Sequence, residues 1–252
     1  MIGVSCTNLC ASGFLDTWNE IGRSFRHWEI FSEGTHAVQS IRDVFLEHAD
    51  SFEMTYSLHS SIADTNIAAV NDRMREASLA ELSSEMDACR RMGIGLITVH
   101  PGIYNLVCGA LRERSIECAK ASMKELDRMS SDMGVTVAIE NMPNPPFMLG
   151  RTADELEHLL EGTDLGVCFD IGHANTTGQT ERMLETFSDR MVNVHIHDNM
   201  GDTDAHMTMG EGMIDFKSII RRLSGYGGRY IIESRSLESA RVSKGFLEEL
   251  LV

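Results

Sequence analysis

The chain has 252 residues, with 22 Lys and Arg against 38 Asp and Glu, which gives a formal net charge of −16. This length fits one large domain or two small ones, and the acidic balance argues against a broad nucleic-acid-binding face, which is normally basic. No apolar run reaches the roughly 18–20 residues of a membrane-spanning helix, and residues 1–11 lack the pattern of a signal peptide. The six cysteines show no CxxC spacing, so we expect reduced thiols in a cytoplasmic protein.

Short apolar runs alternate along the chain with longer amphipathic segments. The apolar runs predict strands over residues 1–6, 27–31, 52–59, 94–100, 135–141, 165–170, 191–195 and 229–233. The amphipathic segments predict helices over residues 14–24, 35–48, 71–92, 113–133, 152–160, 179–187, 216–223 and 238–251. Gly93 and Gly134 have the position of helix C-caps, and Thr152 with Glu155 forms a capping box.

Strict alternation of eight strands with helices indicates a parallel sheet with helical crossovers. Eight units at this length predict one α/β domain over residues 1–252, folded as a (β/α)8 TIM barrel. The alternative is an open doubly wound sheet. It is less consistent with the chain because no Gly-rich phosphate loop follows the first strand.

Polar residues end the last six predicted strands, at the point where each apolar run stops. They are His59, His100, Glu140, Asp170, His195 and Glu233. His173, Asp204 and His206 follow closely in the sequence. A barrel directs the C-terminal ends of all its strands to one face, so we expect these side chains to surround one cavity.

Together these nine residues are five histidines, two glutamates and two aspartates. Imidazole and carboxylate ligands suit Zn, Mn, Fe or Co, and a carboxylate such as Glu140 can bridge two ions. Carboxylates packed together without a cation repel one another, which raises their pKa values. A single histidine at a strand end is more often a hydrogen-bonded or surface residue than a ligand, but six such residues in one register predict a metal site. His197 and Asp198 either orient ligands or are polar loop residues.

Several motifs, in this order and spacing, resemble the xylose isomerase-like TIM-barrel superfamily, which includes sugar isomerases and epimerases and endonuclease IV-type enzymes. They are VHPG at 99–102, IEN at 139–141, FDIGHA at 169–174, HIHD at 195–198, DAH at 204–206, GEG at 210–212 and IE at 232–233. The resemblance covers nearly the whole chain and supports the barrel.

In the isomerase and epimerase branch, the resemblance implies one divalent ion. Its ligands would be Glu140, Asp170, His195 and Glu233. The two glutamates would exchange a proton on opposite faces of the sugar through an enediolate, and His173 would hydrogen-bond a substrate oxygen. We expect His197, Asp198 and Asn141 to contact the substrate. No arginine follows His195 closely, and no lysine ends a strand, which makes lysine-assisted hydride transfer a poor fit.

In the endonuclease IV branch, the resemblance implies three zinc ions and hydrolysis of DNA at abasic sites. Nine residues would hold the ions: His59, His100, Glu140, Asp170, His173, His195, Asp204, His206 and Glu233. All nine types are present. However, residues 60–63 lack the aromatic wedge of that branch, and residues 7–13 lack basic groups for phosphates.

We therefore predict a metal-dependent isomerase or epimerase of a small sugar, sugar phosphate or polyol. It would bind one to three ions of Zn, Mn, Mg or Co, with a small carbohydrate as partner. We expect no membrane partner; nucleic acid is disfavoured but stays open as a partner, and a homo-oligomer is compatible with the sequence. The alternatives are the abasic-site endonuclease and a barrel that binds metal without catalysis.

Overall fold

The computed structural model describes all residues 1–252 and shows eight parallel strands in one closed barrel, with β1 to β8 in chain order. The barrel closes where β1 pairs with β8, because Val4 has Trp28 as its partner on one side and Ile232 on the other. The predicted single-domain (β/α)8 barrel is thus confirmed, and the open doubly wound sheet is wrong.

Each strand is short and mostly buried. The strands are β1 Ile2–Ser5, β2 His27–Phe31, β3 Thr55–His59, β4 Leu96–Val99, β5 Thr136–Glu140, β6 Gly166–Asp170, β7 Met191–Ile196 and β8 Tyr230–Glu233. The helices are α1 Phe14–Gly22, α2 Val38–His48, α3 Asp72–Met92, α4 Arg112–Met133, α5 Ala153–Leu159, α6 Ile171–Thr176, α7 Thr180–Phe187, α8 Phe216–Arg222 and α9 Leu237–Leu250. All eight predicted strands are present.

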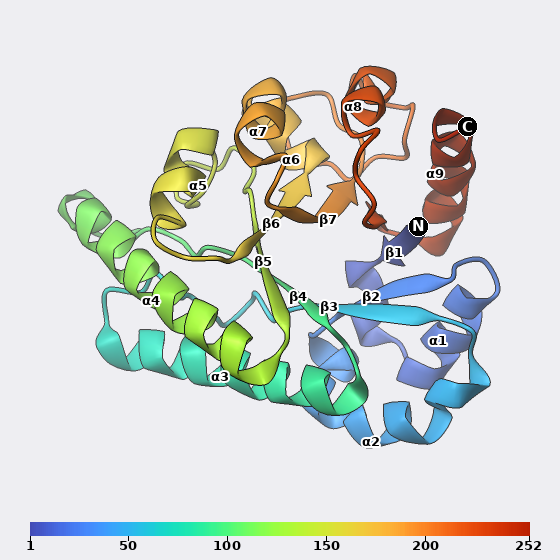
Figure 1. The fold of residues 1–252 in the computed structure, drawn as a ribbon, viewed down its shortest axis with the longest axis horizontal. Coiled ribbons are helices and arrows are strands. Elements are labelled where there is room, and N and C mark those ends of the chain that lie inside the picture. The colour runs from blue at the N-terminus through green and yellow to red at the C-terminus, as the bar shows by residue number, and fades with distance from the viewer.

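The helices surround the strands (Figure 1). Their buried apolar side chains join those of the strands in one core. In α1 the inward stripe is Phe14, Trp18 and Ile21, all buried, because residues three or four apart share one face of a helix. Helices α3 and α4 each end at a glycine in the left-handed region, Gly93 at φ 70° and Gly134 at φ 67°. The two C-caps predicted from the sequence are therefore confirmed.

Two helical segments differ from the prediction. The predicted helix over residues 35–48 is divided, because a 3-10 turn at Gly34–His36 precedes α2. The short helix α6 was missed because it starts directly at the end of β6 and has only 6 residues. Asp170 caps it by accepting a hydrogen bond from the backbone N–H of His173. This cap fixes the position of His173 next to the end of β6.

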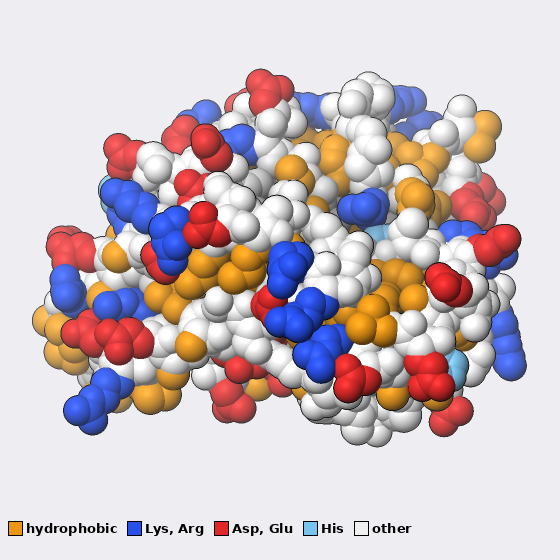
Figure 2. Space-filling view, turned by 60° about the horizontal axis from the view of Figure 1, so that its bottom comes forward, with side chains coloured by type: hydrophobic (Ala, Val, Ile, Leu, Met, Phe, Trp, Pro, Cys, Tyr) orange, Lys and Arg blue, Asp and Glu red, His pale blue; other side chains and the backbone are white.

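The outer surface carries the excess acidic charge. On the face shown in Figure 2, Lys and Arg side chains are interspersed with Asp and Glu, and apolar side chains lie between them. Near the centre of this face, several Lys and Arg side chains lie side by side, with Asp and Glu side chains around them. None of the helices combines the length and the apolar composition needed to cross a bilayer.

Candidate functional site

The six strand-end residues meet at the C-terminal face of the barrel. Their side chains are buried, except that His100 is 23 % exposed. The strand register aligns neighbours, since Asp170 of β6 is the Cα partner of His195 of β7. The barrel therefore brings together residues that are far apart in the sequence, as the strand pattern predicted.

Three of the histidines have one ring nitrogen hydrogen-bonded to an oxygen that can only accept. The acceptors are the backbone carbonyl of Ser60 for His59, that of Asn141 for His173 and the Glu29 carboxylate for His195. The bonded nitrogen therefore carries the proton, and in the neutral ring the other nitrogen presents a lone pair. In each case that second nitrogen faces a carboxylate oxygen. Three histidines are thus oriented as metal ligands usually are.

Nδ1 of His195 is the atom around which the first group converges. It lies 2.8 Å from Oε1 of Glu140, 3.1 Å from Oε1 of Glu233 and 3.9 Å from Oδ2 of Asp170. His59, Glu140, His195 and Glu233 each place one ligand atom within 4.8 Å of all the others. The residues that the epimerase-like interpretation assigns to one ion therefore lie together, and their role as ligands stays a prediction.

The two oxygens of Glu140 face different partners. Oε1 faces His195, whereas Oε2 lies 3.3 Å from Nε2 of His59 and 3.0 Å from Nε2 of His100. A carboxylate in this position has the geometry to bridge two ions. His100, however, belongs to none of the four residue groups that are compact enough to hold an ion.

A second group lies beside the first one. It consists of His173, His197, Asp204 and His206, again with one ligand atom of each within 4.8 Å of the others. Oδ2 of Asp204 is 3.3 Å from Nε2 of His173 and 3.2 Å from Nε2 of His206. His206 is the only non-glycine residue with a positive φ, at 46°. The loop after β7 therefore holds a conformation that is uncommon for this residue type but places its ring in the group.

His197 is a member of this second group that the sequence did not assign as a ligand. Its ring is fully buried and stacks on His206 with 4.0 Å between ring centroids. Nε2 lies 3.3 Å from both Oδ1 of Asp170 and Oδ1 of Asp204. Gly172 faces the ring, and a Cβ at that position would overlap it. His197 thus lies among candidate ligands, and its predicted contact with substrate stays a prediction.

The donor set fits a divalent cation, and its unpaired atoms support this. Oδ2 of Asp170, Oδ1 of Asp204 and both ring nitrogens of His197 are buried without a hydrogen-bond partner. Buried polar atoms without partners are rare and costly. Nε2 of His197 lies 3.3 Å from Oδ1 of Asp204 in the second group, and Oδ2 of Asp170 lies 3.9 Å from Nδ1 of His195 in the first. Divalent ions bound by imidazole and carboxylate would satisfy these three atoms.

The shifted pKa values of Glu140 and His195 reflect the same need for positive charge. Burial acts to raise the pKa of Glu140, but the His195, His100 and His59 rings outweigh it and hold that pKa well below its usual value. Burial acts to lower the pKa of His195, but the surrounding acidic groups raise it well above its usual value. In the metal-free chain, protons on the imidazoles thus balance the carboxylates, and an ion would replace them.

Asp198 and Asn141, predicted to contact substrate, are held by the backbone. The two carboxylate oxygens of Asp198 accept hydrogen bonds from the N–H groups of Asn199, Gly210, Gly212 and Ile214. The Asn141 amide exchanges two hydrogen bonds with the backbone of Asp170. Both side chains therefore fix the structure around the site, and their predicted role in substrate binding stays a prediction.

Sequence reasoning missed Glu29, a carboxylate at the centre of β2. Its Oε1 lies 2.7 Å from Nε2 of His195, and neither side chain has exposed surface. The sequence carries one signal for this residue, a charged side chain in the middle of a predicted strand. The structure buries all five residues of that strand. A buried carboxylate requires partners, and Glu29 finds them in Ser57 of the neighbouring strand β3 and in Asn193 and His195 of β7 across the barrel.

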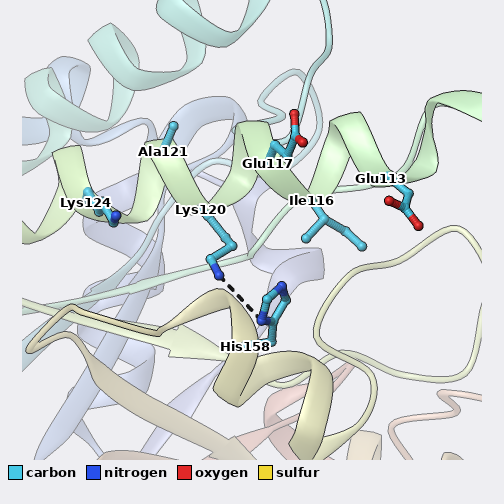
Figure 3. Close-up of a pocket in the computed structure, with 7 residues that line it drawn as sticks. All are labelled: Glu113, Ile116, Glu117, Lys120, Ala121, Lys124 and His158. Carbon is cyan, nitrogen blue, oxygen red and sulfur yellow. Dashed lines mark hydrogen bonds between the residues drawn. The ribbon is translucent and has the colours of Figure 1, made fainter.

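A surface groove lies elsewhere, between α4 and α5 on the outer wall (Figure 3). It measures about 610 Å³, and Lys120, Lys124 and His158 line it together with Glu113 and Glu117. Figure 3 shows Lys120 hydrogen-bonded to His158, and Lys120 also pairs with Glu161. No strand end reaches this groove, so its residues are separate from the buried acidic and histidine groups.

Sequence comparison relates the chain to both branches considered above. The family model described as Xylose isomerase-like TIM barrel matches residues 19–250. The uncharacterized protein MJ1311 of Methanocaldococcus jannaschii is 31 % identical over 90 % of this chain and 81 % of its own length. A protein of Natronomonas pharaonis named probable endonuclease 4 is 29 % identical over 77 % of this chain and 74 % of its own length.

Structural comparison gives a similar picture. A crystal structure of a D-tagatose 3-epimerase-like protein has a TM-score of 0.91 and 29 % identity, and the match covers 99 % of this chain and 96 % of that one. The IolI protein, described with a bound zinc atom, has a TM-score of 0.81 and 15 % identity, covering 99 % and 97 % of the two chains. The IolI match shows the shared fold alone.

Proposed function

The chain belongs to the xylose isomerase-like TIM barrel family, and from this premise we propose that it is a metal-dependent epimerase or isomerase of a small sugar. The convergence of Glu140, Glu233 and Asp170 on Nδ1 of His195 carries the proposal. Glu140, Glu233, His195 and His59 form a compact set for one divalent ion at the end of the barrel, and Asp170 lies beside this set. The likeness to a D-tagatose 3-epimerase-like protein supports the same reaction class.

In this proposal the two glutamates act on the substrate proton. One of them removes the proton from the carbon beside the carbonyl, and the other delivers a proton to the opposite face. The bound ion would polarise the carbonyl and hydroxyl oxygens of the sugar. His173 would hydrogen-bond a substrate hydroxyl by accepting at Nε2, since its Nδ1 donates to the backbone carbonyl of Asn141 and its Nε2 faces the site.

The cavity next to His100 favours a sugar without a phosphate. It measures about 130 Å³ and is lined by apolar side chains that include Ile62, Ile103 and Met142. Neither lysine nor arginine lines it. A phosphate group normally needs such a cation or a helix N-terminus. Among the sugars and sugar phosphates considered, we therefore favour neutral ketoses as substrates.

Solvent deuterium exchange tests this proposal. The metal-loaded protein is incubated in D2O with a panel of neutral ketopentoses and ketohexoses, and NMR follows the loss of the proton beside the carbonyl. We expect metal-dependent exchange and an epimeric product for at least one sugar. Absence of exchange throughout the panel, with metal bound, would contradict proton abstraction.

A second candidate is phosphodiester hydrolysis at abasic sites, which the group of His173, His197, Asp204 and His206 favours. The relatives named probable endonuclease 4 also support it. Residues 60–63 and the acidic surface oppose it. A duplex that contains one abasic site distinguishes the two candidates, because only the nuclease would cleave it. Bound metal without turnover in either assay would indicate a metal-binding barrel that lacks catalysis.

A further inference from the structure

Glu29 is a buried carboxylate that has no place in the proposed proton transfer. It lies at the centre of β2, and its side chain has no exposed surface. Burying a carboxylate is costly unless hydrogen bonds and an opposite charge compensate for the lost hydration. Glu29 receives these from the interior of the barrel, on the side of the candidate metal site.

Both oxygens of Glu29 are occupied by donors. Oε1 lies 2.7 Å from Nε2 of His195. Oε2 accepts hydrogen bonds from Oγ of Ser57 at 2.7 Å and from Nδ2 of Asn193 at 2.8 Å. An ionised carboxylate is an acceptor only, so Nε2 of His195 must be the donor in this pair.

A neighbouring histidine fixes the direction of this network. Nε2 of His27 lies 2.9 Å from Oγ of Ser57. The Ser57 hydroxyl gives its only hydrogen to Glu29, so it accepts from His27. Hydrogen bonds therefore run from His27 through Ser57 to Glu29, and the Glu29 carboxylate has no freedom to reorient.

We propose that Glu29 is a positioning residue that holds the His195 proton on Nε2, so that Nδ1 presents its lone pair to the metal ion. The proposal rests on the metal site of the proposed function. Carboxylates commonly hold ligating histidines in this way, which fixes the tautomer and raises the basicity of the ligand. Glu29 itself touches neither the ion nor the substrate.

The amide of Glu29→Gln cannot reproduce this arrangement. If its oxygen accepts from Ser57 and Asn193, its NH2 group faces Nε2 of His195. That nitrogen must then accept a hydrogen bond, which moves the ring proton to Nδ1 and blocks the ligand atom. The opposite orientation of the amide would place its NH2 group against two donors.

The metal affinity of the Glu29→Gln variant shows whether His195 has lost its ligand atom. Zn²⁺ and Co²⁺ binding to the purified proteins is determined by competition with a chromophoric chelator. We expect Glu29→Gln to weaken binding by about 10- to 100-fold, as is usual for partners of ligating histidines. The matched control is Glu85→Gln, which makes the same change at another buried glutamate, on α3, whose Oε1 accepts from the N–H of Ser61 and not from a histidine ring. An equal loss in both variants, or no loss in either, would overturn the proposal.

The tautomer is observed directly by long-range ¹H–¹⁵N NMR of the zinc-loaded wild-type protein, which needs no variant to fold. We expect the His195 proton on Nε2, and a proton on Nδ1 would overturn the proposal. These measurements do not depend on turnover. If no sugar exchanges but Glu29→Gln still weakens metal binding, the proposed reaction is wrong and the role of Glu29 stands. If sugars exchange but Glu29→Gln binds metal normally, the proposed reaction stands and the role of Glu29 is wrong.

Discussion

Nδ1 of His195 lies 2.8 Å from Oε1 of Glu140, and both side chains are buried. Because Nε2 of the same ring donates to Glu29, the neutral imidazole has a lone pair directed at the carboxylate. Two electron-rich atoms this close require a positive charge, supplied by a proton or a metal ion.

Metal removal should lower the thermal stability. An ion at about 100 times its Kd stabilises the folded state by about 2.7 kcal/mol. For a chain of this size that corresponds to a shift in Tm of about 5–10 °C. Differential scanning calorimetry after EDTA treatment, and again after addition of Zn²⁺, Mn²⁺ or Co²⁺, measures the shift. Asp170→Asn, which removes a carboxylate that faces both groups, should show a much smaller response.

Glu140→Gln and Glu233→Gln should each reduce deuterium exchange by about 10²- to 10⁴-fold, which is the usual contribution of a general acid or base. The glutamine amide cannot accept a proton from carbon. Exchange is measured at saturating Mn²⁺, so that weaker metal binding does not limit the rate. Glu211→Gln changes an exposed glutamate in the loop after β7 and serves as the control. Retained exchange in both active-site variants would exclude them as the acid and base.

Asp204 and His206 distinguish the two candidate functions. The double variant Asp204→Asn, His206→Gln removes two members of the second group but leaves Glu140 and His195 in place. If the protein is an epimerase, exchange should fall by no more than about tenfold, the lower end of the effect of neighbours of a metal site. Inductively coupled plasma mass spectrometry should show fewer ions per chain. Loss of all exchange would indicate that both groups take part in the reaction.

The sequence predicted the residues at the strand ends but not what supports them. Glu140 and Glu233 could be identified because each stops an apolar run, and a barrel aligns those positions. Glu29 could not, since its partner His195 is 166 residues away and lies across the barrel. His197 was left ambiguous for the same reason, because its burial depends on Gly172, which leaves space for the ring. Such contacts come from tertiary packing, which strand periodicity does not encode.

Glu85 should make the stability depend on pH. Burial raises the pKa of its carboxyl from 4.5 to about 7, and hydrogen bonds from Ser32 and Ser61 offset this only in part. Folding therefore favours the protonated form, so this contribution is complete below pH 4.5 and is lost as the pH rises to 7. We expect the unfolding free energy to fall by about 2 kcal/mol between pH 5 and pH 8 because of this group.

The comparison that isolates this effect is between the wild type and Glu85→Gln, by urea unfolding at pH 5 and pH 8. The metal site titrates equally in both proteins and cancels in the difference. Between pH 5 and pH 8, the unfolding free energy of the variant should rise by about 2 kcal/mol relative to that of the wild type. Glu76→Gln alters an exposed glutamate on the same helix and should leave the pH profile unchanged. Parallel profiles for Glu85→Gln and wild type would contradict the raised pKa.

Asp198 should fix the loop that carries Asp204 and His206. Its carboxylate accepts four backbone hydrogen bonds, one from the N–H of Asn199 and three from N–H groups of residues 210–214. In Asp198→Asn the new NH2 group would face donors, so the loop that carries Asp204 and His206 should loosen. We expect a loss of about 2 kcal/mol in unfolding free energy, as for other charged hydrogen bonds. Fewer ions should bind, while the ion beside Glu140 remains. Asp215→Asn is the control, since asparagine also caps helices and α8 should be unaffected. A variant with unchanged metal content would show that the loop holds its shape without Asp198.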